Sequence, residues 1–338
     1  MQPQRSRVLA TSFVTDLGHE GTIFPAAGGN SADPKVQAVY WRCIAVFYYS
    51  ARINNPQLSL VFFTNYEPPV LDGVPFRSIL EKLGVEIVLV PMTHRFTDKR
   101  SQSWGNVLYF LDIMDRVERD NFCDAIMLVD SDVVVVGNLD AMYATLSGRE
   151  FVGYAVHRPV DENINGLSRL EMTQIAAEVF DVHPSGPVTD FGGELFACTL
   201  AAWRRNRHIF DRIYDLALNG DGLLKRISTE EHFYSLAYAV LGDKVGVDTT
   251  FLKRLWTAYK FSTVRPGDEN YAIWHLPAEK RYGIADLYAV VRDGGFDLAM
   301  SPAAFKALAQ RQCGIPRRGP VKSVRDFSRK AALKLGWA

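Results

Sequence analysis

The chain contains few cysteines, and they lie far apart. Cys43, Cys123, Cys198 and Cys313 form no Cys-x-x-Cys pair within the 338 residues. This spacing excludes a zinc knuckle, a thioredoxin-like motif and a disulfide-stapled scaffold. We therefore expect the protein to work in a reducing compartment.

Long hydrophobic runs are also absent. The longest apolar stretches, 126–129 and 133–136, have the length of strands, whereas a membrane-spanning helix needs about 20 residues. Residues 1–7 are not followed by the apolar core of a secretory signal, and the sequence contains no Asn-x-Ser/Thr acceptor site. These absences favour a cytoplasmic location.

Net charge is missing as well, because 38 basic residues balance 38 acidic ones. A globally basic nucleic-acid binder is not supported by this balance, and we expect no nucleic-acid partner. In contrast, 48% of the residues are apolar and 12% are aromatic. Such a chain can bury a large core, so the composition predicts a globular protein.

Strand-like and helix-like segments alternate over the first 140 residues, which indicates parallel βαβ units. Strands are expected at 7–14, 58–64, 85–90 and 124–129, and helices at 36–53, 76–83 and 104–117. The second half is less regular, with segments at 189–199 and 272–275 and helices at 201–218 and 229–240. The sequence thus predicts one α/β domain over residues 1–309, followed by a tail at 310–338.

The most informative motif is Asp130-Ser131-Asp132, which follows the apolar run 126–129 directly. In open α/β sheets, ligands bind at the carboxyl ends of the strands. Two carboxylates at such a position can bind a hard cation, Mn²⁺ or Mg²⁺, that also holds a diphosphate. The alternative is that both acids only cap the following turn.

This segment resembles the Asp-x-Asp motif of nucleotide-sugar glycosyltransferases with the GT-A fold. It is most similar to the glycogenin-like and bacterial galactosyltransferase-like retaining enzymes (family 8), over about residues 7–282. The resemblance implies a single Rossmann-like α/β domain with a mixed central sheet and a C-terminal helical extension. It also implies that Asp130 contacts the metal and the donor ribose, that Ser131 lies in the donor site, and that Asp132 binds the metal.

A second match lies downstream, at Trp274-His275-Leu276 and Lys280. The same families carry a metal-binding His in a late His-x-x-Gly-x-x-Lys-Pro-Trp segment, whose Lys contacts the donor phosphate. The resemblance assigns these roles to His275 and Lys280, although the Gly, the Pro-Trp and one residue of the spacing are missing here. An imidazole beside two carboxylates suits Mn²⁺. A satisfied structural histidine is the alternative.

Other donor contacts are expected near the ends of the first strand and before the third helix. Thr11 and Asp16 stand where GT-A enzymes seat the base and ribose, although an ordinary polar strand end explains them equally well. On the third helix, Asn106 occupies the place of the basic residue that contacts the diphosphate in these families. Lys99 and Arg100, just upstream, are candidates to compensate for it.

Four acids are candidates for binding the sugar and stabilising its reacting centre. Asp190 and Glu194 flank a glycine pair, which permits close backbone approach to a ligand. Glu230 and Glu231 align with the Asp-Gln pair that lies beneath the sugar in the similar retaining enzymes. The alternative for the second pair is a helix N-terminus stabilised by first-turn acids.

The function predicted from these residues is metal-dependent transfer of a hexose from a nucleotide diphosphate sugar, with UDP as the expected nucleotide. The acceptor is expected to be a glycan or a lipid-linked sugar, and the resemblance implies retention of the anomeric configuration. Two alternatives stay open, a sugar-1-phosphate nucleotidyltransferase and a non-catalytic nucleotide-sugar or glycan-binding protein recruited to a membrane.

The neutral total conceals a basic tail. Residues 311–338 contain eight basic residues and one acid, Asp326, so the tail carries a net charge of +7 and the remainder −7. Apolar residues recur at helical spacing from Val321 to Leu335, and Trp337 adds an interfacial ring. This pattern predicts an amphipathic helix that binds an anionic membrane surface, peripheral to the inner membrane. The alternative is a helix packed on its own acidic domain.

Overall fold

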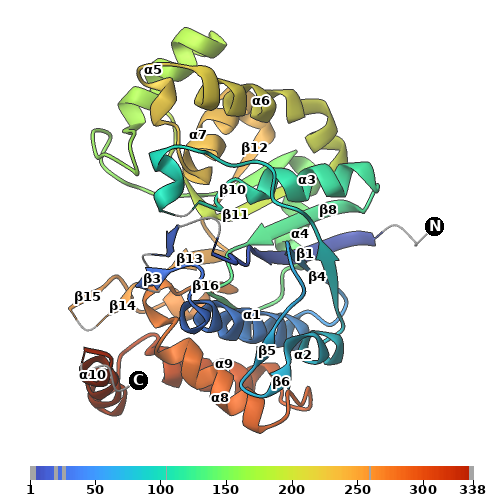
Figure 1. The fold of residues 1–338 in the computed structure, drawn as a ribbon, viewed down its shortest axis with the longest axis vertical. Coiled ribbons are helices and arrows are strands. Elements are labelled where there is room, and N and C mark those ends of the chain that lie inside the picture. The colour runs from blue at the N-terminus through green and yellow to red at the C-terminus, as the bar shows by residue number, and fades with distance from the viewer. Residues whose placement is uncertain (1–4, 19–21, 25–27, 104, 259, 335–338) are drawn as a thin grey trace.

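The computed structural model describes all residues except 1–4, 19–21, 25–27, 104, 259 and 335–338. Its centre is a seven-stranded mixed sheet in the order β12-β10-β11-β8-β1-β4-β7 (Figure 1). The strands are β1 (Arg5–Phe13), β4 (Ser59–Thr64), β7 (Val85–Leu89), β8 (Cys123–Val129), β10 (Phe151–Ala155), β11 (Phe191–Thr199) and β12 (Val245–Asp248). The mixed α/β class predicted from the sequence is confirmed.

The parallel half of the sheet comes from the N-terminal part of the chain. There β1 pairs in parallel with both β4 and β8, and β4 pairs in parallel with β7. In the second half, β11 runs antiparallel to its two neighbours β8 and β10. The regular alternation of the sequence therefore marks the parallel units, and its loss marks the point where the strand direction changes.

Helices cover both faces of the sheet (Figure 1). One face carries α1 (Pro34–Asn54), α2 (Phe76–Lys82), α4 (Asp140–Gly148), α8 (Gly283–Asp293) and α9 (Pro302–Cys313). The other carries α3 (Tyr109–Arg119), α5 (Arg169–Phe180), α6 (Leu200–Asn219) and α7 (Glu230–Leu241). The core consequently lies in two layers, one on each side of the sheet.

Alternation along the strands builds these two layers. Leu9 of β1 and Leu60 of β4 pack with α1, whereas Val8 and Val61 pack into the opposite layer. Successive side chains of a strand point to opposite faces, so a strand covered on both sides must be apolar at almost every position. This explains why the central strands are continuous apolar runs.

A second, three-stranded sheet lies beside the first, in the order β13-β16-β9. It consists of β9 (Val133–Val135), β13 (Leu252–Arg254) and β16 (Ile273–His275). β9 follows β8 after the short turn at 130–132, so the chain passes there from the main sheet to the small one. Three two-stranded pairs complete the strands, β2 (Ile23–Phe24) with β3 (Gly29–Asn30), β5 (Val70–Leu71) with β6 (Val74–Pro75), and β14 (Thr257–Ala258) with β15 (Phe261–Ser262).

Several elements differ from the sequence prediction. The helix expected over 104–117 is α3, which begins at Tyr109, and Trp104 lies outside the described residues. Elements that the sequence prediction did not contain include α4, α5, β10, α8 and α9. Among the described residues, no helix combines the length and the apolar character needed to cross a membrane.

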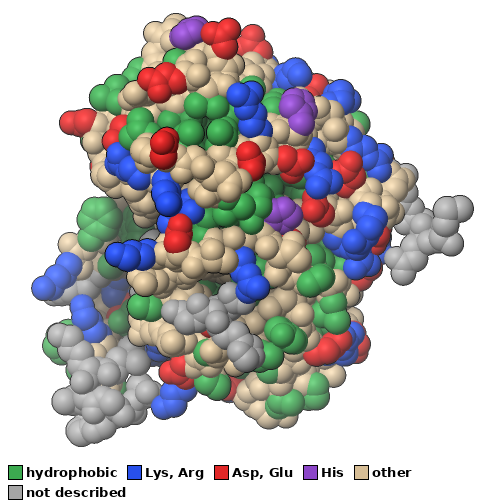
Figure 2. All heavy atoms as spheres, turned by 45° about the horizontal axis from the view of Figure 1, so that its top comes forward, with side chains coloured by type: hydrophobic (Ala, Val, Ile, Leu, Met, Phe, Trp, Pro, Cys, Tyr) green, Lys and Arg blue, Asp and Glu red, His purple; other side chains and the backbone are tan. Residues whose placement is uncertain are grey.

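Charged side chains of both signs share the surface. On the face shown in Figure 2, basic and acidic side chains are interspersed. Arg207, for example, lies within 2.9 to 3.2 Å of the carboxylates of Asp115, Glu118 and Asp211. The acidic and basic side chains are thus mixed locally on this face, and not only equal in total number.

The C-terminal tail forms the predicted helix, α10 (Pro320–Lys334), but its orientation differs from the expectation. Lys322 is buried and forms ion pairs with Glu279 (2.6 Å) and Asp326 (2.9 Å). Asp286 forms ion pairs with Arg325 (2.8 Å) and Arg329 (2.7 Å). These cations face the domain rather than a membrane, because its acids compensate them. Leu335 and Trp337 lie outside the described residues.

We predict that Lys322→Met destabilises the protein by about 3 kcal/mol or more, because it leaves the buried carboxylate of Glu279 without its cation. Urea unfolding followed by circular dichroism measures the change. Lys330→Met, on the exposed side of the same helix, is the matched control and should change the free energy of unfolding by less than about 0.5 kcal/mol. Equal stability of the two variants would contradict the docked orientation of α10.

Candidate functional site

The site lies where the two sheets meet. Asp130, Ser131 and Asp132 form the turn between the end of β8 and the start of β9. β9 pairs with β16 so that Val133 lies opposite His275, and the N–H of Leu276 donates to the Asp132 carbonyl (3.0 Å). This pairing brings residue 275 next to residues 130–132, over 140 positions away along the chain.

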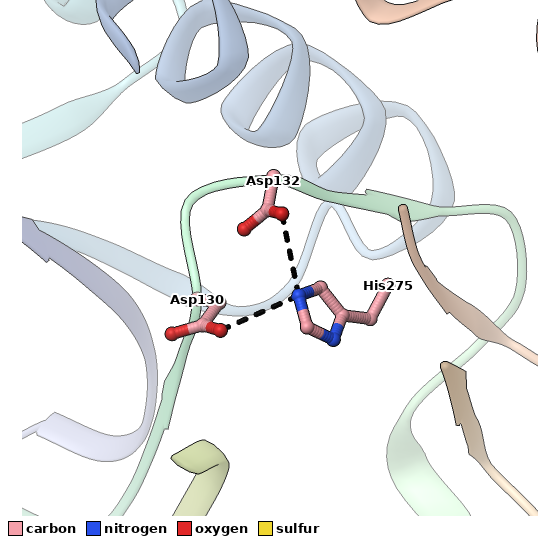
Figure 3. Close-up of side chains that lie close together, drawn as sticks. All are labelled: Asp130, Asp132 and His275. Carbon is pink, nitrogen blue, oxygen red and sulfur yellow. Dashed lines mark ion pairs between the residues drawn. The ribbon is translucent and has the colours of Figure 1, made fainter. Parts of the chain in front are cut away.

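Three side chains converge at this point (Figure 3). His275 Nε2 lies 3.4 Å from Asp130 Oδ2 and 3.3 Å from Asp132 Oδ2. One ligand atom from each residue lies within 4.8 Å of the other two. The structure therefore brings together the three residues that the sequence predicted as metal ligands.

This donor set fits a divalent cation. Ligand atoms about 2.1 Å from one ion and at right angles to each other lie about 3.0 Å apart, close to the two distances from His275. Two carboxylates with one imidazole suit Mn²⁺, which accepts both oxygen and nitrogen ligands. Asp130 keeps 43% of its side chain exposed, so the open side of the group faces the cavity described below.

A lysine supplies positive charge to the same group. Lys280 Nζ donates to Asp132 Oδ2, and the ammonium lies 5.7 Å from the centre of the Tyr40 ring. Burial by itself would raise the pKa of Asp132, but the charges of Lys280 and His275 outweigh it and hold the pKa below its usual range. Asp132 is thus ionised and ready to bind a cation.

The imidazole also lies against a third carboxylate. His275 Nδ1 is 3.4 Å from Glu194 Oε1, on β11. Burial would lower the pKa of His275, but Asp132 and Glu194 together raise it to about 9. Glu194 itself is bound by Arg254, whose Nε and Nη2 donate to its two oxygens at 2.6 and 2.5 Å.

The glycine pair in β11 leaves room for two acids. A Cβ on Gly192 would lie 2.0 Å from Glu194 Oε2, and one on Gly193 would lie 2.3 Å from Glu230 Oε1. Burial and the charges of Glu231 and Asp130 raise the pKa of Glu230 well above its usual range. The buried Oε2 of Glu230 has no hydrogen-bond partner within the described part of the protein.

Asp190 and Glu231 share a basic partner. Arg158 lies 3.2 Å from each of their carboxylates, and Asn165 donates to Glu231 at 3.0 Å. Burial raises the pKa of Asp190 to about 6, against the opposing charge of Arg158. These two acids lie in an ion-pair network rather than on the cavity wall.

A cavity of about 210 Å³ opens at the metal-ligand group. Aromatic rings of Phe13, Phe24 and Tyr40 form one wall, with Phe13 and Tyr40 stacked at 5.5 Å. The predicted site residues that line it are Asn106, Asp130, Ser131, Asp132, Glu230 and Lys280. The cavity thus joins an apolar wall to a strongly charged floor.

Three residues predicted to contact the donor, Thr11, Asp16 and Arg100, are not among the described residues that line the cavity. Thr11 is buried in β1, and its N–H donates to the hydroxyl of Tyr48 (3.2 Å). Asp16 organises its own loop by accepting from Ser31 and from the N–H of Gly18. Neither is a described lining residue of the cavity. Ser12 and Phe13, the last two residues of β1, line it instead.

Arg100 is also turned away from the cavity. Its guanidinium donates to Asp98 and to the carbonyls of Ala217 (2.7 Å) and Ile227 (3.0 Å), and it lies over the ring of Phe96 at 3.8 Å. These contacts fix the loop before α3 to α6. The expectation that Arg100 compensates for Asn106 is therefore not supported by its position.

Sequence reasoning missed Arg254, Arg158 and Tyr40. Arg254 lies in a three-residue strand, and Arg158 lies in a loop after β10. Neither position belongs to a motif, so no local signal could have identified them. Tyr40 was visible only as part of the helical pattern of α1.

Comparisons with known proteins find only distant similarity. Neither a family model nor a curated protein matches the chain. Mouse xyloside xylosyltransferase 1 is 12% identical over 80% of this chain and 97% of its own, with a TM-score of 0.46. LgtC, solved as an active-site mutant, is 11% identical over 85% and 95%, with a TM-score of 0.47.

The bifunctional glycosyltransferase WbbM is 9% identical over 81% of this chain but only 46% of its own, with a TM-score of 0.47. At these identities and TM-scores, neither an activity nor a residue role is carried over to this chain.

Proposed function

We propose that this protein is a metal-dependent glycosyltransferase that moves a hexose from a nucleotide diphosphate sugar to a glycan or lipid-linked acceptor. The observation that carries the proposal is the convergence of Asp130, Asp132 and His275 beside the charged cavity. This group lies at the carboxyl end of β8. A divalent cation held by these residues would bind the donor diphosphate and offset the charge of the leaving group.

The cavity divides into regions that suit the parts of such a donor. The rings of Phe13 and Tyr40 offer a flat apolar wall for the base, which we propose to be uracil. Lys280 is placed to move its ammonium from Asp132 to the diphosphate when a metal ion neutralises that carboxylate. Ser131 and Asn106 add hydroxyl and amide groups along the same wall.

The sugar would lie against Glu230. Its carboxyl group lines the cavity, and its Oε2 has no hydrogen-bond partner among the described residues, so it is available to a sugar hydroxyl. Asp190 and Glu231 lie behind it and act through Arg158. Retention of the anomeric configuration is part of the proposal, and NMR of the product anomer tests it.

We predict that Mn²⁺ raises the melting temperature of the wild-type protein and not that of His275→Ala. A ligand that binds only the native state stabilises it by an amount set by its concentration and affinity. His157→Ala, at an exposed histidine, is the control and should keep the shift. An equal Mn²⁺ shift in His275→Ala would contradict the assignment of His275 as a ligand.

We predict that Mn²⁺ supports release of a nucleoside diphosphate from one donor in a panel of UDP-, GDP- and TDP-sugars, and that EDTA abolishes it. Asp132→Ala should lower kcat about 100-fold or more, because it removes charge stabilisation at the leaving group. Asp221→Ala, at an exposed acid, should leave kcat unchanged.

The same assay separates the alternatives. Pyrophosphate release from a nucleoside triphosphate and a sugar phosphate would indicate a nucleotidyltransferase. Donor binding without turnover, and unchanged function in Asp132→Ala, would favour a non-catalytic binding protein.

We also propose that α10 contacts a membrane through its exposed apolar side chains. The exposed side of α10 is apolar, with Val321, Val324 and Phe327 exposed by 79%, 68% and 70%. Phe261, in the neighbouring β15, is 57% exposed, and Phe327 shares a cavity with Lys260 and Lys330 beside that hairpin. Apolar side chains would therefore make the contact, with few free cations to assist.

We predict that the double variant Val324→Asp/Phe327→Asp loses cosedimentation with liposomes, while Leu170→Asp, at an exposed leucine of α5, keeps it. Because most cations at the face of α10 nearest the domain are paired, binding should depend only weakly on anionic lipid. Binding by the double variant, or binding that requires anionic lipid and fails in high salt, would contradict the apolar contact.

A further inference from the structure

Glu194 has a setting unlike that of the other predicted acids. Its side chain is fully buried, and it is not among the described residues that line the cavity. Both oxygens are bound by Arg254, and Oε1 also faces His275 Nδ1 at 3.4 Å. A carboxylate enclosed in this way cannot reach a sugar, so the sequence-based expectation that Glu194 acts on the sugar is not supported by its position.

Strand pairing fixes this arrangement from two sides. In the small sheet, Arg254 of β13 lies opposite His275 of β16. In the main sheet, Leu195 of β11 lies opposite Val129 of β8, and the N–H of Asp130 is 3.3 Å from the Glu194 carbonyl. Glu194, Arg254 and His275 thus each lie in a paired strand, and their side chains meet between the two sheets.

Because Glu194 is buried, its carboxylate depends on the ion pair with Arg254. Glu194 has no contact with solvent, and its two oxygens accept hydrogen bonds from Nε and Nη2 of Arg254. Such a group is stable in a folded protein only when its hydrogen bonds and its charge are both satisfied.

We infer that Glu194 is a positioning residue that holds the His275 ring with Nδ1–H directed at Oε1, so that the Nε2 lone pair faces Asp130 and Asp132, and that Arg254 locks Glu194 in place. This inference rests on the proposed metal site. Metal-binding histidines commonly donate their second ring N–H to a carboxylate, which fixes the tautomer and the ring orientation.

Arg254 extends this arrangement toward the sugar side of the cavity. Its Nη2 also lies 3.4 Å from Glu231 Oε1, and Glu231 is bound in turn by Arg158 at 3.2 Å. Arg254 thus contacts both Glu194, which orients His275, and Glu231 in the first turn of α7. A change at Arg254 should therefore affect both halves of the site.

The test measures Mn²⁺ affinity by isothermal titration calorimetry for the wild type, Glu194→Gln and Glu194→Ala. We expect the Kd of Glu194→Ala to rise about 10- to 100-fold. Glu194→Gln keeps an oxygen that can accept from Nδ1–H but loses the charge, so its Kd should rise by a smaller factor. This partial rescue is expected only if the hydrogen bond to His275 matters.

A second readout reports on the ring itself. With Mg²⁺ bound, ¹⁵N NMR of histidine-labelled protein should show His275 protonated at Nδ1 in the wild type and in Glu194→Gln. Glu194→Ala should keep this proton but lose its hydrogen bond, so the Nδ1–H resonance should shift upfield and exchange faster with water. A merely structural role of Glu194 would lower stability without changing this signal.

Glu171→Gln is the matched control. Glu171 accepts two bonds from Arg226, at 2.6 and 3.1 Å, and Arg226 lies far from the metal ligands in sequence and in the contacts of the structure. This variant should melt at a lower temperature and bind Mn²⁺ like the wild type. If Glu194→Ala does not fold, the Mn²⁺ affinity of Glu194→Gln decides the question, and an affinity equal to that of the wild type would overturn the inference.

The outcomes separate the inference from the proposed function. Unchanged Mn²⁺ affinity and an unchanged Nδ1–H resonance in Glu194→Ala would overturn the inference and leave the metal site intact. A wild-type protein that binds Mn²⁺ in a Glu194-dependent way but turns over no nucleotide sugar would support the inference and overturn the proposed function. A wild type that binds no Mn²⁺ would overturn both.

Discussion

The burial of acidic side chains around one cavity is the constraint on which the rest of the structure depends. Six carboxyl groups lie on or behind its wall, on Asp130, Asp132, Asp190, Glu194, Glu230 and Glu231; all are buried except Asp130 and Glu230, which line the cavity. Charges removed from water must be paired, neutralised by protonation or bound to a cation. Arg254 pairs with Glu194, the raised pKa of Glu230 favours its protonated form, and we propose that Asp130 and Asp132 bind a metal ion.

The meeting of two sheets is what makes this concentration of charge possible. The main sheet supplies Asp130 at the end of β8 and Glu194 on β11, and the small sheet supplies His275 and Arg254 in one register. Because β9 continues directly from the Asp130–Asp132 turn, the metal ligands are connected to both sheets by backbone hydrogen bonds. Side chains on such rigid elements keep their geometry better than side chains on loops.

The tail follows the same electrostatic rule at another place. Glu279, Asp286 and Asp326 bind the cations of α10, so a segment with a net charge of +7 docks on a domain with the opposite charge. The helix consequently turns its apolar side outward. Amphipathicity could be read from the sequence, but which side faces the protein depends on acids that lie at a distance along the chain.

The sequence by itself determined the local features. Continuous apolar runs specified the buried strands, helical spacing specified α1, α6 and α7, and the position of Asp130 and Asp132 after a buried strand specified a candidate metal site, with His275 added by resemblance. These features depend on neighbours within a few residues, which a sequence pattern records. Tertiary structure alone decided the antiparallel pairing of β11, the small sheet, the role of Arg254 and the withdrawal of Thr11, Asp16 and Arg100 from the cavity. Each of these depends on contacts between distant segments, where strand register and charge compensation select the partner.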